Sequence, residues 1–252
     1  MFIGKSGQLL EDIAVPDKEQ LEANINAVKN FAQTYENIPT TVMLVPDAAC
    51  ILSNRLPAFA TVEDQRQMFG MVERNLGDTV NWVDTVSIMN KHKSEKLYYK
   101  TDHHWTTLGA YYGYQALAAA MKLDTSKAPA MKSYAVTNSF NGTLSATSGY
   151  ETDYNEPIYI YAPDDLKTAP QVVVNNVNEK KKTATLYDTS KLKEKDKYAL
   201  FLGGNYPVLD IRTTADTTDR LLLVKDSYAN SVIPFLTAYY REIIVVRSKI
   251  LL

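Results

Sequence analysis

The chain has 252 residues, 45% of them hydrophobic, and a formal net charge of −2 at pH 7. These values allow a sizeable core, and we expect a single domain over residues 1–252 that carries an insertion. A net charge near zero provides no long-range attraction for nucleic acid or anionic lipid, so binding of polyanions is disfavoured.

Cys50 is the only cysteine, so an intramolecular disulfide is excluded and the redox compartment stays undetermined. No apolar run approaches the length of a membrane span, and the first five residues do not form a signal peptide. We therefore expect a chain without a membrane span that is either cytoplasmic or has had a leader removed.

The first half of the chain alternates between helical and strand-like patterns. The expected elements are a helix at 17–32, a strand at 40–45, a helix at 63–76, a strand at 80–83, a short helix at 84–93, a strand at 97–100 and a helix from Thr106 or Thr107 to Met121. This alternation predicts a parallel sheet with helices on both faces. In such sheets ligands gather at strand ends, and residues 102–105 lie between a strand and a helix.

The second half begins with a change in composition. Residues 126–197 are rich in Thr, Asn, Lys and Tyr and contain β-prone runs without a long helical pattern, which indicates a β-rich insertion. The β-prone runs are 171–174 and 183–187, and the charged run 193–197 reads as a solvated turn. The expected elements after the insertion are a strand at 198–202, a turn at 203–207, a strand at 221–224, a helix at 232–240 and a strand at 242–246.

The densest polar segment is 98–107, which holds two of the three histidines. An imidazole beside a carboxylate, as in Asp102, His103 and His104, can move protons near neutral pH. The segment lacks a nucleophile. Ser227 supplies one, because it lies at a strand-to-helix turn elsewhere in the chain.

A serine hydroxyl becomes nucleophilic when a base takes its proton, and the base works best when a carboxylate fixes its tautomer. Asp102, His104 and Ser227 supply these three groups. The free N–H groups and dipole at the start of a helix can stabilise an oxyanion beside Ser227. Asn205, which follows two glycines at another strand end, is the candidate side-chain donor.

Segment 101–106 (Thr-Asp-His-His-Trp-Thr) resembles the signature of the DHHW family, bacterial proteins related to the alginate O-acetyltransferase accessory proteins and to SGNH-type hydrolases and acyltransferases. Segments 140–144, 202–207 and 225–231 agree with that resemblance. It spans most of the chain and implies a three-layer α/β fold of the SGNH-hydrolase type, with a parallel sheet flanked by helices.

The resemblance also implies roles for single residues. An Asp-x-His pair ahead of the catalytic serine makes Asp102 the orienting acid, His104 the base and Ser227 the nucleophile, whereas His103 either hydrogen-bonds substrate or packs. The implied reaction is cofactor-free acyl transfer, as an O-acetyltransferase or acetylesterase, on a cell-surface or secreted polysaccharide. A membrane O-acyltransferase is the implied partner, and the implied location is extracytoplasmic, behind an N-terminal membrane anchor.

The resemblance has one departure. The family's last strand usually continues into an Asp-x-Arg-Tyr segment, whereas this chain has Val-Arg-Ser-Lys-Ile at 246–250. The resemblance therefore does not carry over an arginine contact to substrate at this segment.

Several alternatives stay open for single residues. Ser227 could serve only as a helix cap, and Asn205 could serve only to form a turn, since Gly-Gly-Asn favours positive φ. Tyr228 and Asn230 either line the cleft or stabilise the turn that holds the serine.

Two alternatives concern the class of protein. A non-catalytic module could keep this fold and bind glycan or partner a membrane O-acyltransferase. A metal-dependent hydrolase could use His103 and His104, but adjacent histidines seldom ligate one ion and no multi-histidine or multi-cysteine spacing accompanies them, so no metal is expected.

Overall fold

The computed structural model describes residues 1–150, 154–165, 167 and 169–247. Positions 248–250 of the altered C-terminal segment lie outside the described residues. Among the described residues, no helix is both long enough and apolar enough to cross a membrane.

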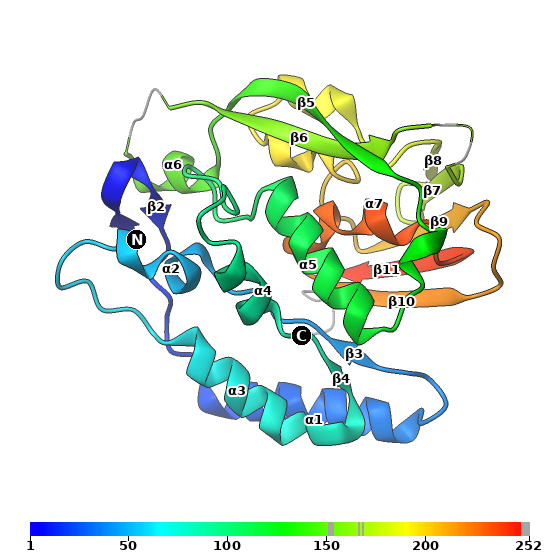
Figure 1. Cartoon of the computed structure of the whole chain (residues 1–252), viewed down its shortest axis with the longest axis horizontal. Coiled ribbons are helices and arrows are strands. Elements are labelled where there is room, and N and C mark those ends of the chain that lie inside the picture. The colour runs from blue at the N-terminus through cyan, green and yellow to red at the C-terminus, as the bar shows by residue number, and fades with distance from the viewer. Residues whose placement is uncertain (151–153, 166, 168, 248–252) are drawn as a thin grey trace.

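The chain folds into helices and short strands (Figure 1). The α-helices are α1 (Lys18–Thr34), α2 (Ala48–Ile51), α3 (Gln65–Leu76), α4 (Thr85–Lys91), α5 (Thr107–Ala120), α6 (Thr143–Ser148) and α7 (Ile233–Leu236). The strands are β1 (Phe2–Ile3), β2 (Leu9–Leu10), β3 (Thr41–Val42), β4 (Asn81–Trp82), β5 (Met131–Phe140), β6 (Glu156–Pro163), β7 (Val172–Asn176), β8 (Lys181–Thr183), β9 (Val208–Thr213), β10 (Arg220–Lys225) and β11 (Glu242–Arg247).

Three of the expected helices begin at side chains that cap them. Asp17 Oδ1 accepts from Gln20 N at 2.8 Å at the start of α1, and Asp84 Oδ1 accepts from Ser87 N at 3.0 Å at the start of α4. Thr106, one of the two expected caps, does the same for α5. Such caps satisfy N–H groups that have no partner within the helix, which fixes where each helix starts.

The main sheet is mixed rather than parallel. Its strand order is β10-β11-β9-β7-β8, in which only β10 and β11 pair in parallel. β3 and β4 form a separate parallel pair. The expected parallel sheet is therefore present only in part. β7 and β8 are joined by a short turn, which favours antiparallel pairing, and β9 pairs antiparallel with both β7 and β11.

Segment 126–197 contributes to two parts of the structure. β5 and β6 pair as a long antiparallel ribbon, whereas β7 and β8 belong to the main sheet. In Figure 1 this ribbon runs along one edge of the molecule, and α1 and α3 lie side by side along the opposite edge, next to β3 and β4.

Three expected elements differ in the structure. Residues 97–100 do not form a strand, since only Tyr98 makes an isolated bridge, to Trp105. The run 198–202 is not a strand either: residues Lys197–Leu200 form a 3₁₀ turn, and Phe201 makes only an isolated bridge to Tyr187. The expected helix at 232–240 is shorter, since α7 ends at Leu236. All three segments are largely buried, and periodicity alone cannot separate a short buried strand from a buried turn.

The principal core surrounds Trp105, which is fully buried against α5. Gly113 of α5 is part of this packing, since a Cβ there would lie 2.7 Å from two Trp105 ring atoms and 3.1 Å from Met43 Cε. A side chain at position 113 would displace the tryptophan.

We predict that Gly113→Ala lowers the free energy of unfolding by about 1–3 kcal/mol, because the methyl group overpacks the core beneath Trp105. Gly70→Ala is the matched control within α3, where the nearest contact is the flexible end of Arg74 at 3.3 Å. That variant should gain up to about 1 kcal/mol from helix propensity. Urea denaturation measures both, and equal effects would contradict this account of the core.

Candidate active site

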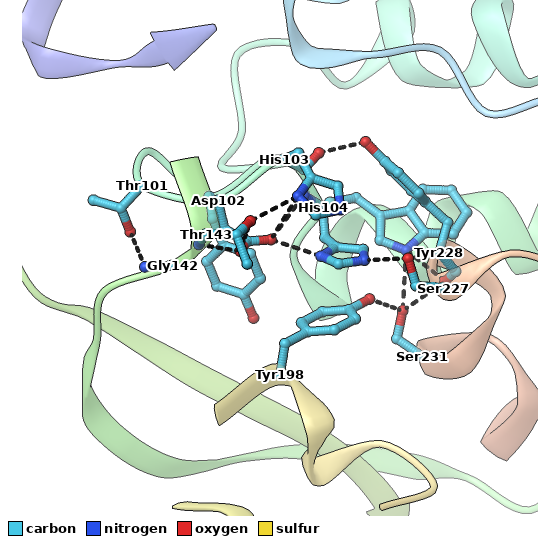
Figure 2. Close-up of polar contacts among 12 residues, drawn as sticks. Thr101, Asp102, His103, His104, Gly142, Thr143, Tyr198, Ser227, Tyr228 and Ser231 are labelled. Carbon is cyan, nitrogen blue, oxygen red and sulfur yellow. Dashed lines mark hydrogen bonds and ion pairs between the residues drawn. The ribbon is translucent and has the colours of Figure 1, made fainter. Parts of the chain in front are cut away.

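The site forms where two distant segments meet. β10 ends at Lys225, and Ser227 opens the 3₁₀ turn Ser227–Ser231 that leads into α7. The Asp102–Trp105 segment lies just ahead of α5, held by a bridge between Tyr98 and Trp105. Figure 2 shows the side chains of the two segments pointing toward one another.

Asp102, His104 and Ser227 form one continuous hydrogen-bonded chain (Figure 2). His104 Nδ1 lies 2.6 Å from Asp102 Oδ1, and His104 Nε2 lies 2.8 Å from Ser227 Oγ. Because a carboxylate only accepts, Nδ1 carries the proton and Nε2 is left as the acceptor for the serine hydroxyl. This is the arrangement that a general base requires.

Asp102 is buried, but protein groups donate hydrogen bonds to both oxygens of its carboxylate. Oδ1 also accepts from His104 N at 2.9 Å, and Oδ2 accepts from Thr143 N at 2.8 Å and Thr143 Oγ1 at 2.9 Å. Burial alone would raise the pKa of Asp102, but the hydrogen bond and charge of His104 and the backbone donor of Thr143 hold that pKa well below its usual range. Asp102 is therefore ionised.

A glycine makes room for the donors that bond to Asp102. Gly142 lies so close to Asp102 that a Cβ at position 142 would come within 2.3 Å of Asp102 Cβ and 2.5 Å of Oδ2. The absence of a side chain lets the N-terminus of α6 approach the carboxylate and place the Thr143 donors against it. Gly142 N also donates to Thr101 Oγ1 at 3.0 Å.

A buried glutamate orients the chain ahead of Asp102. Glu156 Oε2 accepts from Lys100 N at 2.7 Å, from Thr101 N at 3.1 Å and from Thr101 Oγ1 at 3.1 Å. Lys96 Nζ lies 2.8 Å from the other oxygen, Oε1. Glu156 thus fixes the backbone just before the Asp-x-His pair.

Aromatic side chains fix the imidazole plane and the serine turn together. The Tyr198 ring stacks on His104 with centroids 3.8 Å apart and an interplanar angle of 11°, and its hydroxyl lies 3.0 Å from Ser231 Oγ. Trp105 Nε1 donates to Ser231 Oγ at 3.0 Å and to Tyr228 O at 3.1 Å. The packing that buries Trp105 therefore also sets the position of the turn that carries Ser227.

His103 lies beside the chain of hydrogen bonds rather than in it. Its Nδ1 is 2.8 Å from Thr143 Oγ1, whose proton goes to Asp102, so His103 Nδ1 donates and Nε2 is its acceptor. Burial and the neighbouring His104 lower the pKa of His103, against the opposing effect of Asp102. His103 is only partly buried and supports Thr143 through this bond.

The other predicted site residues are close by but differ in availability. Tyr228 donates its hydroxyl proton to the His103 carbonyl, so it ties the turn to the histidine segment. Asn230 is 1% exposed and both ends of its amide are bonded, Oδ1 to Lys225 and Nδ2 to Asn205, so in this structure it stabilises the turn that holds the serine. Asn205 is exposed and belongs to the same polar cluster.

Asp102, His103 and His104 also place three potential metal-ligand atoms within 4.8 Å of one another, which is the one such group among the described residues. Most of these atoms are already engaged, however. Asp102 accepts on both oxygens, and Nδ1 of each histidine is held by Asp102 or Thr143. His104 is also bonded at Nε2, so a metal ion held by both Asp102 and His104 would have to break hydrogen bonds of the site.

A family profile for DHHW proteins matches residues 19–246, nearly the whole chain. The chain belongs to the DHHW family. No functionally curated protein matches it.

Solved structures with the same fold include a DHHW family protein from Eubacterium siraeum, which has a TM-score of 0.76 and 21% identity over 96% of this chain and 80% of that one. Bacillus cereus PatB1 with a sulfonyl adduct has a TM-score of 0.73 and 20% identity, over 94% of this chain and 81% of PatB1. The O-acetyltransferase domain of Pseudomonas putida AlgJ has a TM-score of 0.56 and 20% identity, over 97% of this chain and 77% of that domain. This DHHW protein therefore has a mixed α/β fold similar to theirs.

Sequence reasoning did not assign roles to Thr143, Glu156, Tyr198 and Lys225 in this DHHW protein. Thr143 and Lys225 lie in segments that carry the family resemblance, and this position is a sequence signal that could have placed them in the site. No such signal exists for Glu156 and Tyr198, because a lone acid or a lone tyrosine in a β-rich stretch does not indicate which side chain it will contact.

We predict that Asp102→Asn lowers the free energy of unfolding at pH 7 by about 2–3 kcal/mol, because the ionised acceptor of several bonds is lost. The folded pKa of Asp102 lies below its unfolded value of about 3.9, so the carboxylate's contribution is present above about pH 4 and is lost as the pH falls through the folded pKa. Urea melts at pH 7, 5, 4 and 3 should show the wild-type advantage shrinking toward acid. An advantage that grows below pH 4 would contradict this assignment.

Proposed function

We propose that this protein is a serine-dependent acyltransferase or esterase that moves or removes acetyl groups on a polysaccharide. The observation that carries the proposal is the hydrogen-bonded chain from Asp102 through His104 to Ser227, which ends at a partly exposed serine. Ser227 Oγ attacks the acyl carbonyl while His104 Nε2 takes its proton, and His104 then protonates the departing sugar oxygen. A second sugar hydroxyl or water, deprotonated by His104, takes the acyl group from the serine.

The negative charge that develops on the carbonyl oxygen needs hydrogen-bond donors. Tyr228 N is already bonded to Asp226 Oδ1 at 2.9 Å, which leaves the Ser227 N–H as the backbone donor in our proposal. Asn205 Nδ2 is the proposed side-chain donor. Loss of one such donor costs about 100-fold to 1000-fold in rate.

A polymer is the proposed substrate because Ser227 is partly exposed and does not line the large cavity of the fold. That cavity, of about 1150 Å³, lies elsewhere, between α5, α7 and the β5–β6 ribbon, and none of the triad residues lines it. A partly exposed serine outside such a cavity can be reached by one sugar unit of a long chain. No cofactor enters the proposed reaction, since an activated serine and an oxyanion site suffice for ester chemistry.

Further parts of the proposal come from the relatives. PatB1 is known with a sulfonyl adduct, and the AlgJ domain is described as an O-acetyltransferase, which supports acyl chemistry on this fold. We extend this to an extracytoplasmic location with a membrane anchor, a membrane O-acyltransferase as partner, and a three-layer SGNH-type domain with an insertion at 126–197.

We predict that phenylmethanesulfonyl fluoride adds one sulfonyl group per chain to the wild-type protein and none to Ser227→Ala, because among the described residues Ser227 is the serine whose hydroxyl is bonded to a histidine ring nitrogen. Hydrolysis of p-nitrophenyl acetate should fall by about 1000-fold or more in the same variant. Intact-protein mass spectrometry measures the adduct, and Ser133→Ala, at an exposed position of β5, is the control that should label normally. An unlabelled wild type would favour the non-catalytic module that binds glycan or partners an O-acyltransferase.

The two adjacent histidines should differ in their effects. We predict that His104→Ala lowers p-nitrophenyl acetate turnover by about 1000-fold, because it removes the base. His103→Ala should cost less than about tenfold, since the His103 ring bonds to Thr143 Oγ1 and the backbone donors of Thr143 and His104 to Asp102 remain in the variant. The reverse order of the two effects would overturn the assignment, and loss of wild-type activity with a chelator would favour the metal-dependent alternative.

A further inference from the structure

A buried cation lies two residues from the proposed nucleophile. Lys225 ends β10, is 5% exposed, and makes no ion pair with a carboxylate among the described residues. Instead its ammonium donates to two amide oxygens, Asn230 Oδ1 and, at 3.2 Å, Asn205 Oδ1. Burial of an ammonium without a carboxylate partner is unfavourable. The two amide groups to which Lys225 donates therefore indicate its role.

The chemistry of the ammonium fixes how both amides are turned. An ammonium has three donors and no acceptor, so each asparagine must present its oxygen to Lys225 and point its NH₂ group elsewhere. The Nδ2 of Asn230 then donates to Asn205 Oδ1 at 3.1 Å. Asn205 Oδ1 therefore accepts two hydrogen bonds, and a flipped Asn205 amide would set donors against donors.

This leaves Asn205 Nδ2 as the amide group of the cluster that makes no hydrogen bond to another of the described residues. Its side chain is exposed, whereas Asn230 and Lys225 are buried behind it. The preceding loop brings Asn205 to this position through three residues with positive φ, Leu202, Gly203 and Gly204. The hydrogen bonds from Lys225 and Asn230 then set the orientation of the Asn205 amide.

We infer that Lys225 is a positioning residue, which turns the Asn205 amide so that its Nδ2 donors face the oxyanion that forms at Ser227. This inference rests on the proposed function and adds to it the group that orients the side-chain donor. The cluster is coupled to the serine turn directly, because Asn230 belongs to the turn Ser227–Ser231.

The charge of Lys225 makes the arrangement dependent on pH. Burial lowers the pKa of Lys225 to about 8, with Asp226 acting to raise it and Arg247, at the end of the neighbouring β11, acting to lower it. Above that pH the neutral amine can accept as well as donate, so the amide of Asn205 is no longer confined to one orientation. Turnover should therefore decline as the pH rises through about 8.

The test compares wild type, Lys225→Met, Asn205→Ala and the double variant in p-nitrophenyl acetate turnover from pH 6.5 to 9.5, after subtraction of buffer hydrolysis. Asn205→Ala should lose about 100-fold to 1000-fold in kcat and Lys225→Met about 10-fold to 100-fold, both with KM nearly unchanged, and both should lack the decline above pH 8. The double variant should be no slower than the slower single variant, because both substitutions remove one donor. Lys132→Met, at an exposed lysine of β5, is the control that should match wild type.

Thermal melting of each variant separates this role from simple loss of folding. Lys225→Arg is a second test variant, because arginine is also a cation with donors only but keeps its charge to high pH. The Lys225→Arg variant should retain more activity than Lys225→Met, and its activity should extend above pH 8. Effects that multiply in the double variant, or a decline above pH 8 that persists in Lys225→Met, would overturn the inference while leaving the triad intact. A wild type that releases no p-nitrophenol would overturn the proposed function and this inference with it.

Discussion

The buried hydrogen bond between Asp102 Oδ1 and His104 Nδ1 is the interaction on which the rest of the site depends. A carboxylate removed from water is unfavourable unless donors replace its hydration. Here His104 and Thr143 supply those donors, and the bare backbone of Gly142 lets Thr143 come close enough to do so. One glycine and one threonine, some 40 residues after the motif, thus make an ionised aspartate compatible with burial.

The same bond also decides what His104 can do. With Nδ1 committed to Asp102, only Nε2 can accept the proton of Ser227, and the stacked ring of Tyr198 prevents the imidazole from turning away. Trp105 joins the two halves of the site, because it is buried against α5 and its indole N–H holds the turn that carries the serine. Core packing and the geometry of the site are therefore parts of one structure in this protein, and buried neighbours hold the turn that carries Ser227.

Sequence reasoning recovered those features that depend on local patterns. Asp17, Asp84 and Thr106 cap helices where the sequence places them, because caps act within one turn. The pairing of strands was only partly recovered: β11 lies between β9 and β10, an order that short-range patterns do not specify. The DHHW segment and Ser227 were recognised as parts of one site from residue chemistry and family resemblance. Local patterns do not predict the side chains that complete the site. Glu156 and Tyr198 contact residues more than 30 positions away in the sequence. The role of Lys225 depends on which amide oxygens lie near its ammonium in the folded chain.

The most direct test of this account is a crystal structure of the protein after reaction with a p-nitrophenyl phosphonate. The account predicts a covalent bond from phosphorus to Ser227 Oγ, with the phosphoryl oxygen about 2.7–3.1 Å from Ser227 N and Asn205 Nδ2. His104 Nε2 should face the position of the leaving group and keep its partner Asp102. Phosphorus bonded to a different residue, or a phosphoryl oxygen directed at His103 with Asn205 Nδ2 turned away, would contradict it.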